Sequence, residues 1–297
     1  MQRMRWSFIV AAFLSLISLA GVVQAEDQWL YPYILASETE GDVNASAEQV
    51  KAALKANGFD VVGSYAPYAD TVVIGATNGA LKAAAAKSKF GGYGAVARIA
   101  VTKVGGKVQV SFFNPDWMAE AYRMESDLTA VREGLEKALG MQRVFGSEEP
   151  GWKANQLNKY HFMVFMPYFD DHNELAEHDS YEAAIKAVEA NLAAGKGNTA
   201  KVYRVDVPGK QQTVFGVAIG GAPAGDEHIM KIIDKAATKQ TAHLPYELLV
   251  SGGNVYALHA KFRIAVNFPD LDMGTFMHIN DAPDAIEESL QQAAGGK

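Results

Sequence analysis

The chain contains no cysteine among its 297 residues. This absence excludes disulfide bonds, catalysis by a thiol nucleophile and metal sites built on thiolate ligands. The folded protein must therefore be stabilised by apolar cores rather than by a disulfide framework. A soft metal ion would have to be bound by thioether or imidazole groups instead.

Long apolar runs are also missing, except at the N-terminus. Residues 6–23 are mostly apolar, follow Arg3 and Arg5, and end in a small-x-small sequence at residues 23–25. This pattern predicts a signal peptide, residues 1–25. An uncleaved membrane anchor is the alternative, because the run approaches spanning length. The acidic residues that follow favour cleavage, so we expect a periplasmic or secreted protein with no stable membrane insertion after signal cleavage.

The sequence also lacks an excess of positive charge. Loss of Arg3 and Arg5 with the signal peptide would leave 25 basic against 34 acidic residues, a net charge of −9. A protein of that sign lacks the basic surface with which proteins bind nucleic acid or anionic lipid. We therefore expect no nucleic-acid partner.

Common enzyme signatures are absent as well. The chain has no Gly-x-Ser-x-Gly motif, no His-Glu-x-x-His motif, no phosphate loop and no dinucleotide fingerprint. Asp116 and Asp270 recur at similar places and could act as an acid or base. The alternative is that each caps a turn beside a proline. The sequence therefore favours a binding protein over an enzyme.

Two similar stretches suggest that one unit occurs twice. Residues 114–124 (NPDWMAEAYRM) return in altered form as residues 267–278 (NFPDLDMGTFMH). Each follows a β-like run and precedes an amphipathic helical pattern. Glycine pairs at residues 105–106 and 252–253 predict tight turns in two hairpins. We interpret this as duplication of a whole domain with a period of about 140 residues.

Each unit is predicted to be α+β, in the order β-α-β-β-α-β-β-α with mainly antiparallel strands. The first unit, residues 26–146, has predicted strands at residues 29–35, 59–65, 71–76, 95–101 and 108–113, and helices from Ser46 to Gly58 and at residues 79–88 and 128–139. Residues 147–158 are the predicted linker. The second unit, residues 159–297, has predicted strands at residues 161–169, 201–207, 213–219, 246–250 and 255–266, and helices from Asp179 or Ser180 to Gly195 and at residues 227–237 and 283–294.

Three features of the sequence carry a resemblance to a known family: the element order, the glycine-containing strand at residues 72–78 (VVIGATN) and the Asn-Pro loop after the hairpin. In these features the chain resembles two DUF302 domains in tandem, over nearly the whole mature chain. The resemblance implies a small α+β domain with an antiparallel sheet backed by helices. The function of that family is unknown, so no catalytic residue is implied. In the second copy residues 267–269 replace residues 114–115, and Leu271 stands where Trp117 does, so the copies need not bind equally.

We expect a small ligand or cofactor near the repeated loop or in a groove between the units, where ligands tend to bind. The predicted ligand-binding residues are Asn114, Asp116, Trp117, Tyr122, Asn267 and Asp270. Trp117 and Tyr122 could line an aromatic pocket or belong to the core. A purely structural homodimer, with sheets paired across subunits, is another interpretation.

Metal binding is the alternative function. Met273, Met277 and His278 are predicted ligands, because thioether and imidazole groups suit copper. Residues 161–166 could add His161 and two methionines, or these could fill the core. A haem would accept the same ligands but would be noncovalent, since no Cys-x-x-Cys-His motif is present. The chain would then be a copper- or haem-binding redox or metal-handling protein.

Histidine is confined to the second half of the chain. Its seven positions are His161, His172, His178, His228, His243, His259 and His278. His172 lies among acidic residues in what is either a solvated loop or a site for a divalent ion. His259 is predicted to face solvent on a strand, together with Lys261 and Arg263.

Overall fold

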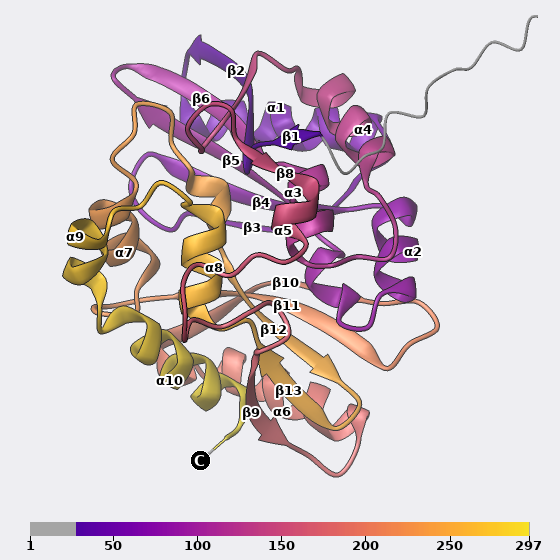
Figure 1. Ribbon diagram of the computed structural model, residues 1–297. Coiled ribbons are helices and arrows are strands. Elements are labelled where there is room, and N and C mark those ends of the chain that lie inside the picture. Colours follow the sequence, from indigo (N-terminus) through magenta and orange to yellow (C-terminus); the bar gives the residue numbers. More distant parts are fainter. Residues whose placement is uncertain (1–27, 297) are drawn as a thin grey trace, which may run out of the picture.

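The computed structural model describes residues 28–296, so the predicted signal peptide lies outside the described part of the chain. These residues form two main antiparallel sheets with helices, and the fold is α+β as predicted. In Figure 1 the first sheet and its helices, indigo to magenta, lie above the second sheet and helix α6. No helix within residues 28–296 is long and apolar enough to cross a membrane.

The first sheet has the spatial order β3-β4-β5-β6-β2-β7. Its strands are β2 (Tyr33–Glu40), β3 (Asp60–Tyr65), β4 (Thr71–Thr77), β5 (Ala97–Val104), β6 (Lys107–Phe113) and β7 (Arg143–Phe145). Helices α1 (Val43–Ala56) and α4 (Thr129–Leu139) pack on it through their apolar sides. Helix α1 begins before the predicted cap Ser46, because the Asp42 side chain accepts a hydrogen bond from the Ala45 amide.

The second sheet has the spatial order β10-β11-β12-β13-β9. Its strands are β9 (Asn173–Glu177), β10 (Thr199–Asp206), β11 (Gln212–Ile219), β12 (Tyr246–Ser251) and β13 (Asn254–Ala257). Helices α6 (Tyr181–Ala193) and α10 (Ala282–Ala294) pack on it. In each half of the chain, the second to fifth strands lie side by side in sequence order, and the first strand lies beside the fifth: β3-β4-β5-β6-β2 and β10-β11-β12-β13-β9. A duplicated unit would produce the same order twice.

The two sheets pack face to face. Along β5, Arg98 bonds to Glu247 and Thr102 bonds to Thr241, both from the second half of the chain. Successive residues of a strand point to opposite faces, so Ile99 and Val101 turn toward the helices packed on the first sheet. Both faces of β5 are therefore buried, and one apolar core includes residues of both sheets.

Tyr203 of β10 lies where the sheets approach most tightly. A Cβ atom at Gly75 of the first sheet would lie 2.6 Å from the Tyr203 ring, and at Gly63 a Cβ atom would lie 1.9 Å from the carbonyl oxygen of Val202. Within the second sheet the same ring lies over Gly216, where a Cβ atom would be 2.4 Å from it. Gly75 is thus required by the packing of one sheet on the other.

The predicted linker belongs to the first half of the structure. Strand β8 (Trp152–Lys153) pairs with β1 (Trp29–Leu30), and helix α5 (Ala154–Leu157) packs against helix α3 (Pro115–Ala121). Helix α3 takes the place of the predicted Asn-Pro loop. It forms because proline fits the first turn of a helix and Asn114 caps that turn.

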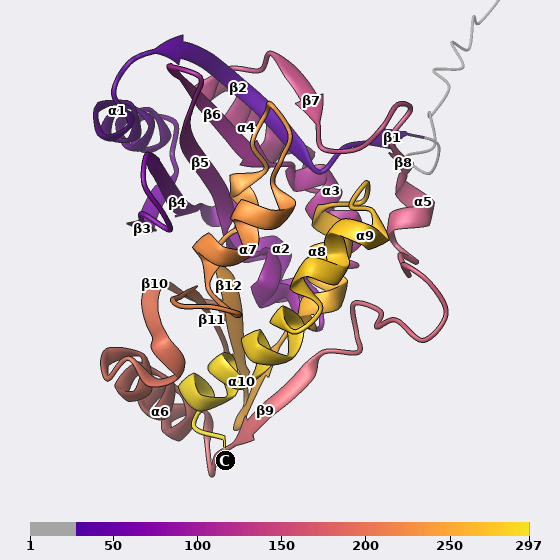
Figure 2. The same ribbon diagram turned by 90° about the vertical axis from the view of Figure 1, so that its left-hand side faces the viewer.

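The predicted strand over residues 161–169 is wrong, because residues 158–172 have no regular structure and the strand is β9. Figure 2 shows this segment running as a long loop from α5 to β9. Its residues have high β-propensity, but propensity alone does not make a strand where no neighbouring strand pairs with it.

The predicted strand over residues 255–266 is also wrong beyond Ala257. Helix α8 (Ala260–Asn267) follows, capped by His259, whose Nδ1 accepts a hydrogen bond from the Lys261 amide at 3.2 Å. The apolar residues of this run fit a strand and a helix almost equally well, so their spacing does not separate the two. Arg263, predicted to face solvent, is 1% exposed on this helix.

Candidate functional site

Asn114 and Asp116 have structural contacts. The Asn114 side chain donates to the Tyr31 carbonyl at 2.9 Å and accepts from the Asp116 amide at 3.1 Å. Arg132 Nε lies 2.7 Å from the Asp116 carboxylate, which holds helix α4 against α3. Burial raises the pKa of Asp116, and the Arg132 ion pair opposes that rise. Asn114 therefore caps helix α3, and Asp116, which the sequence suggested as a cap, is the ion-pair partner of Arg132.

Trp117 and Tyr122 point into the core rather than into an open pocket. Trp117 is 0% exposed and Tyr122 is 2% exposed. The Tyr122 ring stacks on Phe169, with 5.5 Å between ring centres. The Trp117 indole nitrogen lacks a hydrogen-bond partner within the described residues, whereas the Tyr122 hydroxyl hydrogen-bonds Arg98. The aromatic pair is therefore part of the contact between the two halves of the chain.

The second copy of the loop is positioned differently from the prediction. His259 is the fold counterpart of Asn114, because each caps the helix that follows a hairpin. Asn267 ends helix α8 and corresponds instead to Tyr122. Its side-chain nitrogen lies 2.9 Å from His243 Nδ1 in the interior. Asp270 lies in the exposed turn after the helix.

An open apolar pocket does lie beside this second copy. We call it the methionine pocket; its lining includes Met163, Met166 and Met273, three phenylalanines, and Lys261 as its only charged residue. The phenylalanines are Phe162, Phe268 and Phe276. The empty volume is about 410 Å³, part of it open to solvent. One wall comes from the irregular loop. The others come from α8 and from helix α9 (Met273–Phe276), which follow that loop about 100 residues later in the sequence.

The surface around the methionine pocket is unusually apolar. Met163 is 51% exposed, Phe165 100%, Met273 47% and Met277 55%. Phe165 also has a φ angle of +70°, which is a rare conformation for a bulky side chain. Exposed apolar patches with this concentration of large side chains mark binding sites for ligands or partners.

Of the three predicted metal ligands, one lines the methionine pocket. Met273 lines the methionine pocket, whereas Met277 and His278 lie on the following exposed turn and are not part of its lining. His161 Nε2 lies 2.6 Å from the Met166 carbonyl, and its ring stacks on Tyr168. The structure therefore groups Met273 with two methionines of the irregular loop rather than with a histidine.

The interpretation of His172 as a ligand for a divalent ion is not supported. Its ring centre lies 4.1 Å from that of Phe90 and 4.5 Å from that of Tyr256. Burial lowers the pKa of His172. Across residues 28–296 no group of three or more histidine and acidic side chains is placed to hold a metal ion.

Known proteins give no guide to this site. The chain matches no family model, no curated protein and no solved structure. The DUF302 resemblance consequently remains a hypothesis, and the function has to be argued from the geometry.

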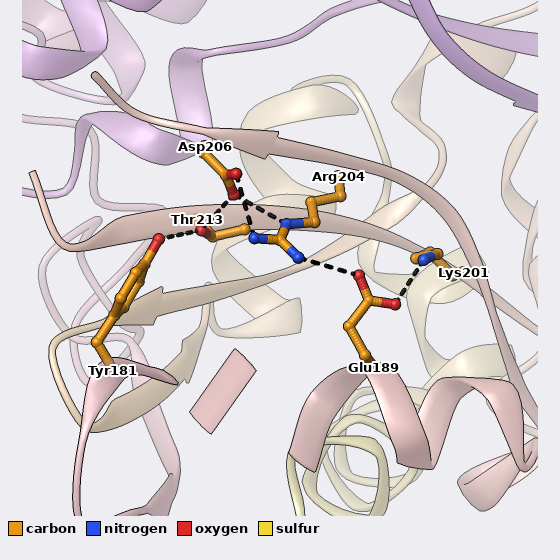
Figure 3. Close-up of polar contacts among 6 residues, drawn as sticks. All are labelled: Tyr181, Glu189, Lys201, Arg204, Asp206 and Thr213. Atoms are coloured by element: carbon orange, nitrogen blue, oxygen red, sulfur yellow. Dashed lines mark hydrogen bonds and ion pairs between the residues drawn. The ribbon is translucent and has the colours of Figure 1, made fainter. Parts of the chain in front are cut away.

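The polar network in Figure 3 lies on the second sheet and is structural. Glu189 of α6 pairs with Lys201 at 2.5 Å and with Arg204 at 3.5 Å, and Arg204 also holds Asp206 at 2.9 Å. Although burial raises the pKa of Asp206, hydrogen bonds from Arg204 and Thr213 lower it overall. All the charges drawn are paired with one another, so the network fixes α6 on β10 and offers no free group to a ligand.

Proposed function

We propose that this protein is an exported, non-enzymatic binding protein made of two DUF302-like units, and that it binds a small apolar molecule in the methionine pocket. The observation that carries the proposal is an open pocket with almost entirely apolar walls on an otherwise acidic protein. Ligand sites are typically concave and apolar, with few polar groups to orient the ligand.

The lining chemistry narrows the ligand class. Methionine side chains are flexible and polarisable, so they adapt to ligands of irregular shape and make favourable contacts with aromatic rings. Lys261 is the one charged lining residue, and its Nζ lies 3.7 Å from Asp284, a distance that leaves a weak surface ion pair. We infer an aromatic or branched aliphatic ligand that carries at most one acidic group, directed toward Lys261.

Replacing Met273 with glutamate tests this proposal. The apolar anionic dye 1-anilinonaphthalene-8-sulfonate serves as the probe, and its fluorescence titration gives the dissociation constant. We expect Met273→Glu to weaken binding of the dye by about tenfold or more. The substitution removes apolar contact worth about 1 kcal/mol or more of binding free energy, and the new carboxylate repels the sulfonate.

Met141 provides the matched control, because it is also 47% exposed but lies outside the methionine pocket. Met141→Glu should leave the dissociation constant unchanged. Equal binding by the Met273→Glu and Met141→Glu variants would reject the methionine pocket as the ligand site.

A second candidate function, copper binding, is favoured by the three thioethers in one pocket. Thioether ligands select copper(I), and a chain without cysteine must use them. Under this hypothesis Met163→Leu combined with Met273→Leu removes two ligands while it preserves the apolar wall. We expect that variant to lose copper(I) in a competition with bathocuproine disulfonate but to keep the dye affinity.

Retention of copper(I) affinity in the double leucine variant would refute the copper hypothesis. A visible absorption spectrum of the untagged protein, purified from its exported compartment, tests the haem variant of the same hypothesis. A colourless, metal-free protein that still binds the dye would leave the apolar ligand as the function.

A further inference from the structure

A buried group of charged and phenolic side chains lies between the two sheets, away from the methionine pocket. Arg98 Nη1 of β5 lies 3.2 Å from Glu247 Oε2 of β12, and Arg263 Nη1 of α8 lies 3.6 Å from the same oxygen. Tyr203 donates to the other carboxylate oxygen at 2.7 Å. We call Arg98, Arg263, Glu247, Tyr33, Tyr93 and Tyr122 the arginine cluster.

The arginine cluster carries more positive than negative charge. Although burial lowers the pKa of Arg98, the neighbouring Tyr122 and Glu247 raise it overall, so the guanidinium stays protonated. Burial and both arginines lower the pKa of His243, which is therefore neutral. Burial also keeps Tyr33 and Tyr93 protonated by raising their pKa. Two cations thus face one carboxylate in the interior, where an uncompensated charge is costly.

Two other buried acidic groups, Asp226 and Asp234, supply only part of the missing negative charge at pH 7. Asp226 is buried behind Tyr65, whose hydroxyl donates to it at 2.8 Å, and Asp234 accepts from the Gln240 amide. Burial raises the pKa of each to about 7, so each is about half protonated at pH 7. The Phe113 ring centre lies 4.4 Å from the Arg98 guanidinium carbon, and this ring covers one face of the guanidinium without charge.

Several buried polar groups around this charge lack a partner. Among the described residues these are Arg263 Nε and the hydroxyls of Tyr33 and Tyr93, whereas the Arg98 guanidinium hydrogen-bonds Tyr122. All five side chains are at most 2% exposed. Asn267 Oδ1 and Asp226 Oδ1 are buried acceptors without a partner. Buried polar groups in folded proteins are normally satisfied by protein, by ordered water or by an ion, so these unpaired groups require an explanation.

We propose that the arginine cluster binds one small monovalent anion, such as chloride, between the two sheets. An anion only accepts hydrogen bonds and neutralises the unpaired positive charge. A water molecule would satisfy some of these groups, but it would leave the charge unbalanced. The surrounding side chains are at most 2% exposed, so we expect a small anion such as a halide. The proposal is independent of the methionine pocket.

Bromide provides the direct test on the unmodified chain. Crystals grown in sodium bromide should show an anomalous peak at the bromine absorption edge within about 3.5 Å of Arg98 and Arg263, the usual reach of a charge-assisted hydrogen bond to a halide. Ordered water alone at that position, or bromide only at surface sites, would overturn the proposal.

Chloride-dependent stability provides the solution test. At constant ionic strength, with gluconate as the replacement anion, the urea midpoint should rise with the logarithm of chloride concentration above the dissociation constant. Tyr93→Phe removes one donor and keeps the ring, so we expect about tenfold weaker chloride affinity. Tyr160→Phe is the control, because Tyr160 is 3% exposed and lies outside the arginine cluster. A midpoint that does not depend on chloride in the unmodified protein would also overturn the proposal.

Discussion

Replacing Glu247 with glutamine is expected to lower the free energy of unfolding by about 3–5 kcal/mol, because two buried arginines lose their shared countercharge. Glutamine keeps the shape of the side chain and can still accept from the Tyr203 hydroxyl, so the loss isolates the charge. Urea unfolding at pH 7, followed by tryptophan fluorescence, measures it. The same variant should gain more stability from added chloride than the unmodified protein does, because the cluster then has two uncompensated cations.

Glu227→Gln is the matched control for that experiment. Glu227 pairs with Lys231 at 2.7 Å on the surface, with side-chain exposures of 51% and 70%. Exposed ion pairs contribute little, so we expect a change below about 0.5 kcal/mol. A similar cost for the two glutamine variants would mean that the Arg98–Glu247 pair does not hold the two sheets together.

Arg98 and Glu247 also explain why the two units differ in sequence. Arg98 pairs with Gly75 across β4 and β5, and Glu247 pairs with Gly216 across β11 and β12. The two charged residues therefore occupy equivalent places in the two sheets and meet across the interface. Two identical units would bring like charges together there. The opposite charges favour packing of the first unit on the second over self-association of either one.

The local elements could largely be predicted from the sequence. The glycine pairs marked both hairpins, and β-branched runs located β4 and β11 to within about two residues. Helix α8 and the irregular loop could not be predicted, because each depends on what packs against it. The apolar residues from Val255 to Val266 fit both the two-residue period of a strand and the 3.6-residue period of a helix. Residues 161–169 have high β-propensity but no neighbouring strand to pair with.

The site was harder to predict than the fold. Met273 was singled out, and Met163 and Met166, about 100 residues earlier, were named as possible further ligands or as core residues, but the sequence did not place the three in one pocket. Arg98 and Glu247 are single charges within apolar strands, a pattern normally typical of a solvent-exposed sheet face. That face is covered here by the other sheet, which no single-sequence pattern reveals. A charged residue in mid-strand was the one available signal.

The pH dependence of stability should reveal the buried carboxylates. Burial raises the pKa of Asp226 and of Asp234 to about 7, above their ordinary value of 3.8. Between those values the folded protein keeps protons that the unfolded chain releases. The two groups therefore add stability below about pH 4, and this contribution is lost as pH rises through 7. We expect their contribution to the free energy of unfolding to fall by a few kcal/mol from pH 5 to pH 8.

Asp226→Asn separates this effect from other titrations. Asparagine can still accept from the Tyr65 hydroxyl but carries no charge, so we expect the variant to be about 2–4 kcal/mol more stable than the unmodified protein at pH 8. At pH 4 the gain should nearly vanish, because close to its ordinary pKa of 3.8 the aspartate of the unfolded chain also keeps much of its proton. Urea unfolding at the two pH values measures this difference in stability gain, with Asp60→Asn, whose side chain is 77% exposed, as the control. A stability gain of equal size at both pH values would show that packing, rather than the buried charge, governs this position.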